Sequence, residues 1–335
     1  MMLKKLGLVV PLTVALLTGS LVGAQQTTKI PRLCYLAPYP LAELPPVTAT
    51  GMTAYDAFLR GLHDLGYVEG QSLTIDYLSA DGQFARFPIL ANECLRLQAD
   101  MIVVGTTPAA RAAKHATQTI PIVLFGIGDP VGTGLVASLA RPGGNVTGLS
   151  QMAPGLITKR LELLKDIVPR LTRVVVLTNF ANPVSTPQVQ ELEQAARSMG
   201  VQLLIRDVRT PEELPDAFST AATEGAEGLL QTALIMFNVH RARIVDLAAR
   251  YRLPAVYGTR AFVDAGGLMS YGADDFRLNL GVAKFVDKIL KGAKPAELPL
   301  EQATTFEYVI NLKAARALEI TIPPHLLVLA DEVLQ

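Results

Sequence analysis

Short apolar segments alternate with longer amphipathic segments along most of this chain, and this alternation constrains the fold more than any other feature. Leu33 to Ala37 is a short apolar segment, and the next segment, Tyr55 to Leu65, places Phe58 and Leu62 on one face of a helix. Gly66 ends that helix. Strands that alternate with helices build a parallel sheet with right-handed crossovers. We therefore predict an α/β fold.

The alternation runs in two series, one on each side of a turn-forming cluster at residues 141–145. The first series has further expected strands at 72–78, 101–104 and 121–125, and expected helices at 85–99 and 108–117. The second series has expected strands at 173–178, 202–208, 229–233 and 254–257, and expected helices at 159–168, 188–199 and 244–250. Two similar series predict two similar α/β halves.

Three connectors resemble passes of the chain between these halves, at 145–150, 267–271 and 291–300, the last one after an expected helix at 275–290. We place the first lobe at Lys29 to Thr147 plus Tyr271 to Ala293, and the second lobe at Ser150 to Ser270 plus Pro299 to Gln335. Each lobe would be Rossmann-like with a parallel sheet, and crossing strands would join the two.

The composition fits buried parallel sheets and excludes some partners. Hydrophobic residues make up 50% of the chain, so many strands must be covered by helices on both faces. Lys and Arg number 30, as do Asp and Glu, which gives a formal net charge of zero. Because no basic stripe is visible, nucleic acids and anionic membrane surfaces are poor candidates as partners.

The first 24 residues have the pattern of a secretory signal peptide. Lys4 and Lys5 precede an apolar run from Leu6 to Val22, and small residues at 23 and 24 fit a cleavage site. The alternative is a membrane anchor, but Pro11 interrupts a run that is short for a span of about 20 residues. We therefore expect residues 1–24 to be removed and the mature chain to be soluble in the periplasm.

The two cysteines leave two possibilities open. Cys34 lies in an expected strand and Cys94 in an expected helix of the same lobe. A disulfide could persist outside the cytoplasm, and two buried free thiols are the alternative. A metal site has little support, because no Cys or His pair shows ligand spacing. The four histidines are scattered, at His63, His115, His240 and His325.

The first candidate binding segment follows the expected strand at 101–104. Gly105, Thr106 and Thr107 lead directly into an expected helix and offer hydroxyls and backbone amides at its positive end. Ligands of open parallel sheets bind outside the carboxyl ends of the strands, so this helix start is a candidate seat for a carboxylate. The alternative is an ordinary helix cap.

A second candidate segment follows the expected strand at 121–125. Gly128 would let the backbone approach a ligand, and Asp129 could accept hydrogen bonds from an ammonium group. Alternatively, Asp129 caps a helix that contains residues 134–139. The glycines of this segment lack the spacing of a dinucleotide-binding fingerprint.

The other candidates are Asn179, Tyr257 and Tyr39, each at the end of an expected strand. Asn179 can both donate and accept hydrogen bonds. The two tyrosines could form aromatic walls, although Tyr257 could also be part of the core. The sequence shows no nucleophile elbow, zinc motif or phosphate loop, so we expect neither an enzyme nor a bound cofactor.

Four segments carry a resemblance to a known family. They are 61–71 (GLHDLGYVEGQ), 128–148 (GDPVGTGLVASLARPGGNVTG), 265–272 (AGGLMSYG) and 286–293 (VDKILKGA). The chain resembles the ABC transporter substrate-binding proteins of the TrpX-like family. This resemblance implies a type I periplasmic-binding fold, in which a small ligand lies in a cleft between two lobes. Members with an assigned ligand mostly take aromatic amino acids.

The chain departs from the family pattern in two places. Relatives often have Ala-Asp-Pro-Leu-Phe where this chain has Ala233 to Phe237, and Arg-Glu-Phe where it has Arg260 to Phe262. Two acidic groups are therefore missing near the rim of the second lobe. Their absence favours a less cationic, more apolar ligand than an α-amino acid. The lack of tryptophan also makes a sugar less favourable, because sugar rings commonly stack on this side chain.

These observations predict an extracytoplasmic solute-binding component of an ABC import system. The solute would be an aromatic or apolar amino acid or a related carboxylate, held between Thr106, Thr107 and Asp129 on one lobe and Asn179 and Tyr257 on the other. The protein would act as a monomer and deliver the solute to an inner-membrane ABC permease. The alternative is a sensor subunit that presents the solute to a membrane receptor.

Overall fold

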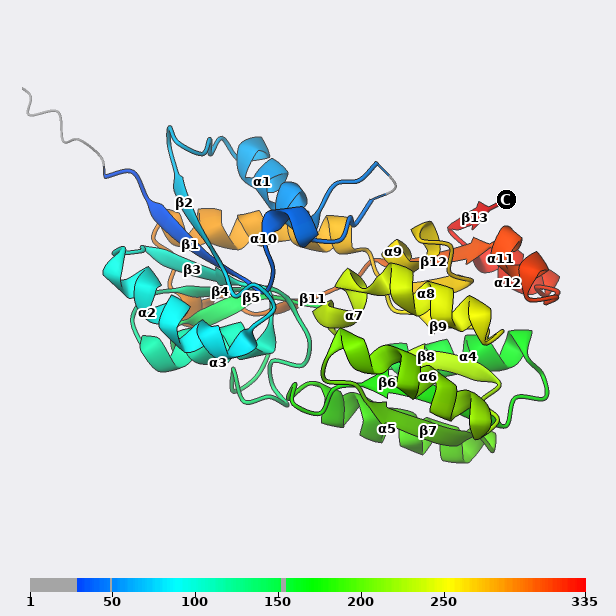
Figure 1. The fold of residues 1–335 in the computed structure, drawn as a ribbon. Coiled ribbons are helices and arrows are strands. Elements are labelled where there is room, and N and C mark those ends of the chain that lie inside the picture. Colours follow the sequence, from blue (N-terminus) through cyan, green and yellow to red (C-terminus); the bar gives the residue numbers. More distant parts are fainter. Residues whose placement is uncertain (1–28, 49, 152–154) are drawn as a thin grey trace, which may run out of the picture.

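The structure is a computed structural model that describes residues 29–48, 50–151 and 155–335. The expected signal peptide at 1–24 lies outside the described residues. Two α/β bodies lie side by side (Figure 1). Both bodies contain parallel strands that alternate with helices, so the predicted α/β fold class is confirmed.

The first body is built on a six-stranded sheet. Its strands are β1 (Arg32–Ala37), β2 (Thr74–Ser79), β3 (Met101–Val104), β4 (Ile122–Ile127), β5 (Val146–Ser150) and β11 (Glu301–Gln302). They pair in parallel in the order β11–β5–β4–β3–β1–β2. The helices of this body are α1 (Ala54–Asp64), α2 (Phe87–Arg96), α3 (Thr107–Ala116) and α10 (Asp275–Leu290), with short 3-10 turns η1 (Leu41–Glu43), η2 (Phe84–Arg86) and η4 (Pro295–Glu297). We call these elements and their loops the first half.

Residues of β1 alternate between two cores, because successive side chains of a strand point to opposite faces. Leu33 and Tyr35 pack in the core beneath α1 and α10, whereas Leu36 packs in the core beneath α2 and α3. Cys34 also points to the second core, where it forms a disulfide with Cys94 of α2. Of the two possibilities that the sequence left open, the structure has the disulfide.

The second body contains two sheets. Strands β6 (Arg173–Thr178), β7 (Gln202–Asp207) and β8 (Gly228–Gln231) pair in parallel in the order β7–β6–β8. Strands β9 (Val256–Tyr257), β10 (Met269–Ala273), β12 (Phe306–Asn311) and β13 (Glu332–Leu334) follow the order β13–β12–β10–β9, with β10 and β12 antiparallel. A bridge between Leu229 and Ala255 connects the two sheets, so they form one continuous layer.

Helices cover both faces of this layer. They are α4 (Leu156–Ile167), α5 (Ser185–Met199), α6 (Leu214–Thr223), α7 (Ile235–Val239), α8 (Arg241–Arg250), α9 (Arg260–Asp264), α11 (Leu312–Ala317) and α12 (Pro324–Leu329), with the 3-10 turn η3 (Pro211–Glu213). One core lies beneath α6 and α8 and the other beneath α4 and α5. We call these elements and their loops the second half.

The chain passes between the halves near its middle and again near its end. It leaves the first half after β5, returns from β10 into α10, and leaves again between β11 and β12. The pairing of β11 with β5 places Glu301 and Gln302 in the first sheet, although the sequence analysis assigned them to the second lobe. The lobe limits as a whole stay a prediction.

Most predicted elements agree with the structure, and one does not. The predicted helix at 275–290 has the bounds of α10, and the predicted strands at 101–104 and 173–178 have those of β3 and β6. The expected helix at residues 134–139 is wrong, because this stretch consists of turns and bends. Gly134 explains the difference, because its φ of 72° lies in the left-handed region, which a helix interior does not adopt.

A partly buried cation, Arg260, pairs the C-terminal strand with the rest of the second half. Arg260, in α9, lies 2.9 Å from Glu307 of β12 and 2.5 Å from Glu332 of β13, and it also pairs with Asp264. The Arg260 side chain is 11% exposed, so solvent screens these pairs less than it screens a surface ion pair. The cluster therefore fixes β13 beside α9, next to the loop that carries Thr259.

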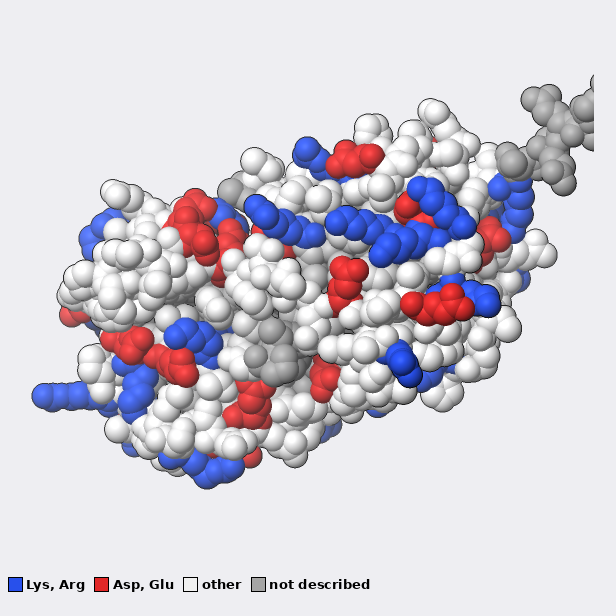
Figure 2. Space-filling model, turned by 180° about the vertical axis from the view of Figure 1, so that it is seen from behind, with Lys and Arg blue, Asp and Glu red and all other residues white. Residues whose placement is uncertain are grey.

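The surface seen in Figure 2 carries basic and acidic side chains of both halves in mixed order. None of the described helices combines the length and the apolar character needed to cross a membrane.

Candidate ligand-binding cleft

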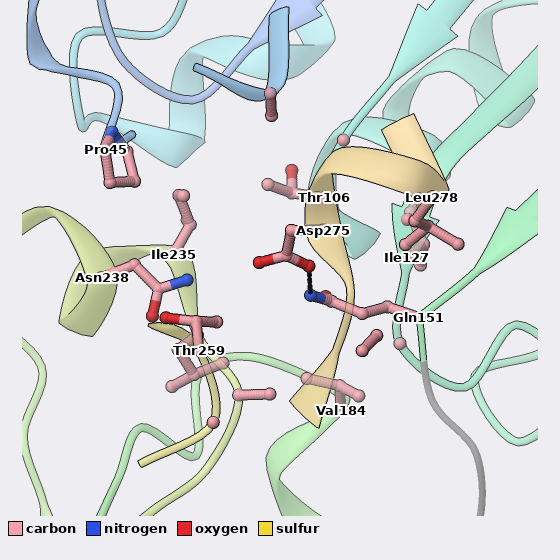
Figure 3. Close-up of a pocket in the computed structure, with 18 of the residues that line it drawn as sticks. Pro45, Thr106, Ile127, Gln151, Val184, Ile235, Asn238, Thr259, Asp275 and Leu278 are labelled. Carbon is pink, nitrogen blue, oxygen red and sulfur yellow. Dashed lines mark hydrogen bonds between the residues drawn. The ribbon is translucent and has the colours of Figure 1, made fainter. Parts of the chain in front are cut away.

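A deep cleft lies between the two halves, at the carboxyl ends of their central strands (Figure 3). It contains about 1410 Å³ of space that atoms do not fill, including its open mouth. Segments of both halves line it, which is the position expected for a ligand in open α/β sheets. The cleft is therefore the candidate functional site.

Apolar side chains form much of the wall on both sides. The first half contributes a proline-containing loop at 44–47 together with Ile127 and Leu278. The second half contributes Val184 and Ile235 from the opposite side (Figure 3). An apolar solute that fits between these walls gains roughly 25 cal/mol for each Å² of apolar surface that it buries.

The start of α3 forms one polar part of the cleft. Thr106 is the N-cap residue of α3, and its hydroxyl accepts a hydrogen bond from the Ala109 amide at 3.4 Å. Thr106 and Thr107 are both buried and both line the cleft. Gly126, also in the lining, has a φ of 63°, and a side chain there would come within 3.1 Å of Leu278. This region offers a helix N-terminus and close-lying backbone to a ligand.

Asp275 provides a carboxyl group at the centre of the cleft (Figure 3). The Gln151 side-chain amide donates a hydrogen bond to its Oδ1 at 2.6 Å. The pKa of Asp275 is raised to about 7, chiefly by burial. The carboxylates of Asp274 and Glu307 contribute to this rise, whereas the hydrogen bond from Gln151 and the charge of Arg160 oppose it. A cationic group placed beside Asp275 would therefore favour the loss of its proton.

Arg160 provides a positive charge on the other side of the cleft. It lies on α4, is only 4% exposed, and lines the cleft. Its Nε donates to the Tyr271 carbonyl at 2.7 Å. Burial lowers the pKa of Arg160 to about 10, although the carboxylates of Asp275 and Glu191 act to raise it. The guanidinium therefore stays charged at neutral pH.

Two further polar residues of the second half line the cleft without a partner for one of their atoms. Gln231 is 2% exposed, and its Oε1 has no hydrogen-bond partner. The same holds for the buried Oγ1 of Thr259. By contrast, the Oε1 of Gln188 accepts a hydrogen bond from the Ala233 amide at 2.9 Å. A ligand or a movement of the two halves could supply the missing partners.

Four of the eight residues predicted from the sequence line the cleft together. They are Gly105, Thr106, Thr107 and Gly128. The carbonyl of Gly128 also accepts a hydrogen bond from the Ser150 hydroxyl at 2.9 Å, which holds the loop after β4 in place. Their predicted role in ligand binding stays a prediction.

Asp129 and Asn179 lie outside the lining of the cleft, because both side chains fold back onto their own loops. Asp129 Oδ1 accepts from the Gly132 amide at 2.8 Å, and Asn179 Oδ1 accepts from the Ala181 amide at 2.9 Å. Each side-chain oxygen thus accepts a hydrogen bond within its own turn and is not part of the cleft lining. The alternative role foreseen for Asp129 was a helix cap, but it caps a turn.

The two tyrosines also lie outside the lining. Tyr257 is 2% exposed, and its ring stacks on Phe262 at a centroid distance of 4.5 Å, so it belongs to the core of the second half. Tyr39 is buried against Phe84, with its backbone carbonyl accepting from the Tyr77 hydroxyl at 2.7 Å. Neither ring forms an aromatic wall of this cleft.

Three charged residues of the described chain line the cleft: Asp275, Arg160 and Glu191. None of them was predicted as a site residue, although the sequence carried signals for the first two. Asp275 follows the end of β10, so the strand-end rule that found Thr106 would have found it too. In the same way, Arg160 lies three residues after Ile157 and four before Leu164, on the buried face of α4. A charged residue on an apolar helix face is a candidate for a special role.

Asp275 also bears on one inference about the ligand, which stays a prediction. The loss of acidic groups at 233–237 and 260–262 favoured a less cationic ligand. Asp275 supplies a carboxyl group to the cleft from another element, α10. The two missing acidic groups therefore no longer argue against a ligand with an amino group.

Comparison with known proteins identifies relatives over nearly the whole of the chain beyond the first 45 residues. A family model described as "ABC transporter substrate binding protein" matches residues 46–334. A protein named "Tyrosine-binding protein" from Clostridioides difficile (strain R20291) is 29% identical over 267 residues, which are 79% of this chain and 76% of that protein.

Two solved structures are similar to the fold described above. A conserved domain protein from Vibrio cholerae has a TM-score of 0.84 and 28% identity, covering 91% of this chain and 100% of that one. An ABC domain from Streptococcus pneumoniae in complex with L-Trp has a TM-score of 0.82 and 27% identity, covering 91% and 99%.

Proposed function

Since this chain belongs to the family of ABC transporter substrate-binding proteins, we propose that it captures an amino acid with an apolar or aromatic side chain in the cleft between its halves. It then delivers this solute to an ABC permease in the inner membrane. The observation that carries the proposal is the cleft itself, which places opposite charges, at Asp275 and Arg160, between apolar walls.

The polar groups of the cleft match the two charged groups of an amino acid. Asp275 can accept hydrogen bonds from an ammonium group, and hydrogen bonds to a charged group are about twice as strong as neutral ones. The start of α3, with Thr106 and Thr107, offers a seat for the carboxylate, as the sequence analysis predicted. Asp129 and Tyr257 lie outside the lining and are left out of this proposal.

The size and character of the side chain follow from the walls and from the relatives. Leu278 and Ile127 on one side and Val184 and Ile235 on the other leave an apolar space between them. One relative bears the name of a tyrosine-binding protein and another was solved with L-Trp. Both observations support an aromatic amino acid as the ligand of this chain.

Transport would depend on closure of the cleft. A ligand that contacts both halves binds more tightly to a closed arrangement than to an open one, so it shifts the population towards closure. The closed halves would then present one combined surface to the permease. The leader-like residues 1–24 support export of the chain to the periplasm.

A thermal-shift screen tests this function. We expect L-tyrosine, L-tryptophan or L-phenylalanine to raise the melting temperature of the mature chain, because a ligand that binds only the native state stabilises it. Sugars serve as the contrast class and should give no shift. A chain that responds to a sugar, or to no amino acid, would contradict the proposal.

A further inference from the structure

Arg160 is a buried cation for which the described residues provide no ion pair. It is 4% exposed, yet no carboxylate oxygen of the described chain lies within 4.0 Å of its guanidinium nitrogens. The hydrogen bond from Nε to the Tyr271 carbonyl uses only one of its donors. A guanidinium has several more N–H donors in a planar fork. Arg160 therefore retains hydrogen-bonding capacity towards the cleft that it lines.

This arrangement is costly for the empty protein. The transfer of an ion from water into a protein interior costs several kcal/mol unless a partner compensates for it. The low pKa of Arg160, about 10, reflects this cost, because burial is its largest cause. The site nevertheless has room for the guanidinium, because residue 258 is a glycine. A Cβ atom at this position would lie only 3.2 Å from the guanidinium. A glycine at this point leaves room for the cation beside the cleft.

We propose that Arg160 binds the carboxylate of the ligand from the second half of the cleft and so determines the selectivity for acids. The inference rests on the proposed capture of an amino acid and deepens it. A planar guanidinium matches a carboxylate in geometry and can bind it with two parallel hydrogen bonds.

If Arg160 has this role, both halves contact the carboxylate of the same ligand. Thr106, at the start of α3, belongs to the first half, whereas Arg160 lies on α4 of the second half. A carboxylate has two oxygens, and each can accept from a different half. Asp275 would hold the ammonium group. The ligand then replaces a missing ion pair, and closure of the cleft brings the two halves onto it.

A set of three matched compounds tests the role of Arg160. L-Tyrosine carries both charged groups, tyramine lacks the carboxylate, and 3-(4-hydroxyphenyl)propionate lacks the ammonium group. Calorimetric titrations would compare the wild type with Arg160→Gln and with Arg160→Lys. Lys159→Gln serves as the control, because Lys159 lies on the same helix but is exposed and pairs with Glu162.

We expect Arg160→Gln to weaken the binding of both carboxylates by roughly 10- to 100-fold, the range for a hydrogen-bonded charged group, and to leave tyramine unchanged. Arg160→Lys should recover part of the loss, because it restores the charge but not the fork. Lys159→Gln should match the wild type. Equal weakening of tyramine and L-tyrosine, or unchanged affinity for L-tyrosine, would overturn the role of Arg160 alone.

The melting temperature of the empty protein separates ligand binding from a structural role. If Arg160 serves the ligand, Arg160→Gln should keep or raise that temperature, because a buried and unpaired charge is removed. A clear drop, together with unchanged selectivity between L-tyrosine and tyramine, would mean that Arg160 only supports the fold. A wild type that binds none of the three compounds, and neither L-tryptophan nor L-phenylalanine, would instead contradict the proposed function and the inference that rests on it.

Discussion

The polar groups on the two sides of the cleft differ in whether they have hydrogen-bond or ion-pair partners. On the first half, Thr106 caps α3 and Asp275 is hydrogen-bonded to Gln151. On the second half, Arg160 lacks an ion pair within the described chain, and Gln231 and Thr259 each bury an atom without a partner. The first side is thus complete in the absence of a ligand, whereas the second side retains unsatisfied groups.

The same contrast extends to the bodies behind the cleft. The first half is one parallel sheet with a disulfide between β1 and α2. The second half is a layer of two sheets whose C-terminal strand is held by the ion pairs of Arg260. A side whose polar groups are already paired thus faces a side with unpaired groups, and a ligand between the two sides can supply the missing partners. Substitutions on either side of the cleft test this contrast.

Removal of the disulfide should destabilise the first half most strongly. The bond closes a loop with a sequence separation of 60 residues. Cross-linking a loop of this length stabilises a protein by about 4 kcal/mol, through the lost entropy of the unfolded chain. We expect Cys34→Ala combined with Cys94→Ala to lower the free energy of unfolding of this half by about that amount, measured by urea denaturation. A reductant should destabilise the wild type but have no effect on the double variant.

Asp275→Asn should weaken the binding of an amino acid by about 2 kcal/mol, or roughly 30-fold, because the variant loses a charged acceptor. Asp274→Asn is the matched control, since Asp274 lies next to it but caps α10 and is not part of the cleft lining. An asparagine keeps this capping function. Equal losses in the two variants, measured by calorimetry, would refute a specific role for Asp275.

The pH dependence of Asp275 offers an independent check. Its pKa in the folded protein is about 7, above the ordinary value of 3.8. The native state therefore holds this proton more tightly than the unfolded state, so its contribution to stability falls as the pH rises from about 4 to about 7. The stability of the empty wild type relative to Asp275→Asn should decrease over this window and then level off. Affinity for an ammonium group should increase over the same window.

Thr106→Ala should have two smaller effects. Loss of the cap of α3 should cost about 1 kcal/mol of stability. If the hydroxyl also contacts the ligand carboxylate, the affinity should fall by roughly 1.5 to 3 kcal/mol, the range for hydrogen bonds to charged groups. Thermal melting and calorimetry on the same variant separate the two effects. A reduced melting temperature with unchanged affinity would leave Thr106 as a cap alone.

Two glutamines of the cleft test whether an unpartnered polar group and a hydrogen-bonded one differ in their effect on stability. Gln231 buries an unpartnered Oε1, whereas the Oε1 of Gln188 accepts from the Ala233 amide. Gln231→Leu should therefore leave the stability of the empty protein unchanged or raise it by up to about 1 kcal/mol, while Gln188→Leu should lower it by about 1 to 3 kcal/mol. The same loss in both variants would show that the Gln231 amide is satisfied in the empty protein.

Local patterns in the sequence predicted the elements that depend on periodicity. The predicted strand at 101–104 and the predicted helix at 275–290 match β3 and α10, because buried strands and amphipathic helices are visible in the order of apolar residues. The sequence analysis left α6 (Leu214–Thr223) without an assignment. Pro215 and three weakly hydrophobic alanines, at 217, 221 and 222, weaken its periodic signal.

The candidate site could be predicted only where a strand end carries its signal in adjacent residues. Gly105 to Thr107 were found in this way. Arg160 contributes from the middle of a helix, and its position at the cleft depends on how α4 packs against β9 and β10. The unpaired atoms of Gln231 and Thr259 depend on the three-dimensional surroundings, which no local pattern contains. The unsatisfied atoms on the second side of the cleft, and the place of Arg160 beside them, were therefore the part that required the structure.

Small-angle X-ray scattering with and without L-tyrosine tests the central claim most directly, because the claim is that a ligand bridges a complete side and an incomplete side of the cleft. We predict that saturating L-tyrosine reduces the radius of gyration of the wild type, and that Arg160→Gln shows no such reduction at a saturating concentration. Saturation of the wild type, verified by calorimetry in the same buffer, with an unchanged scattering profile would contradict the account.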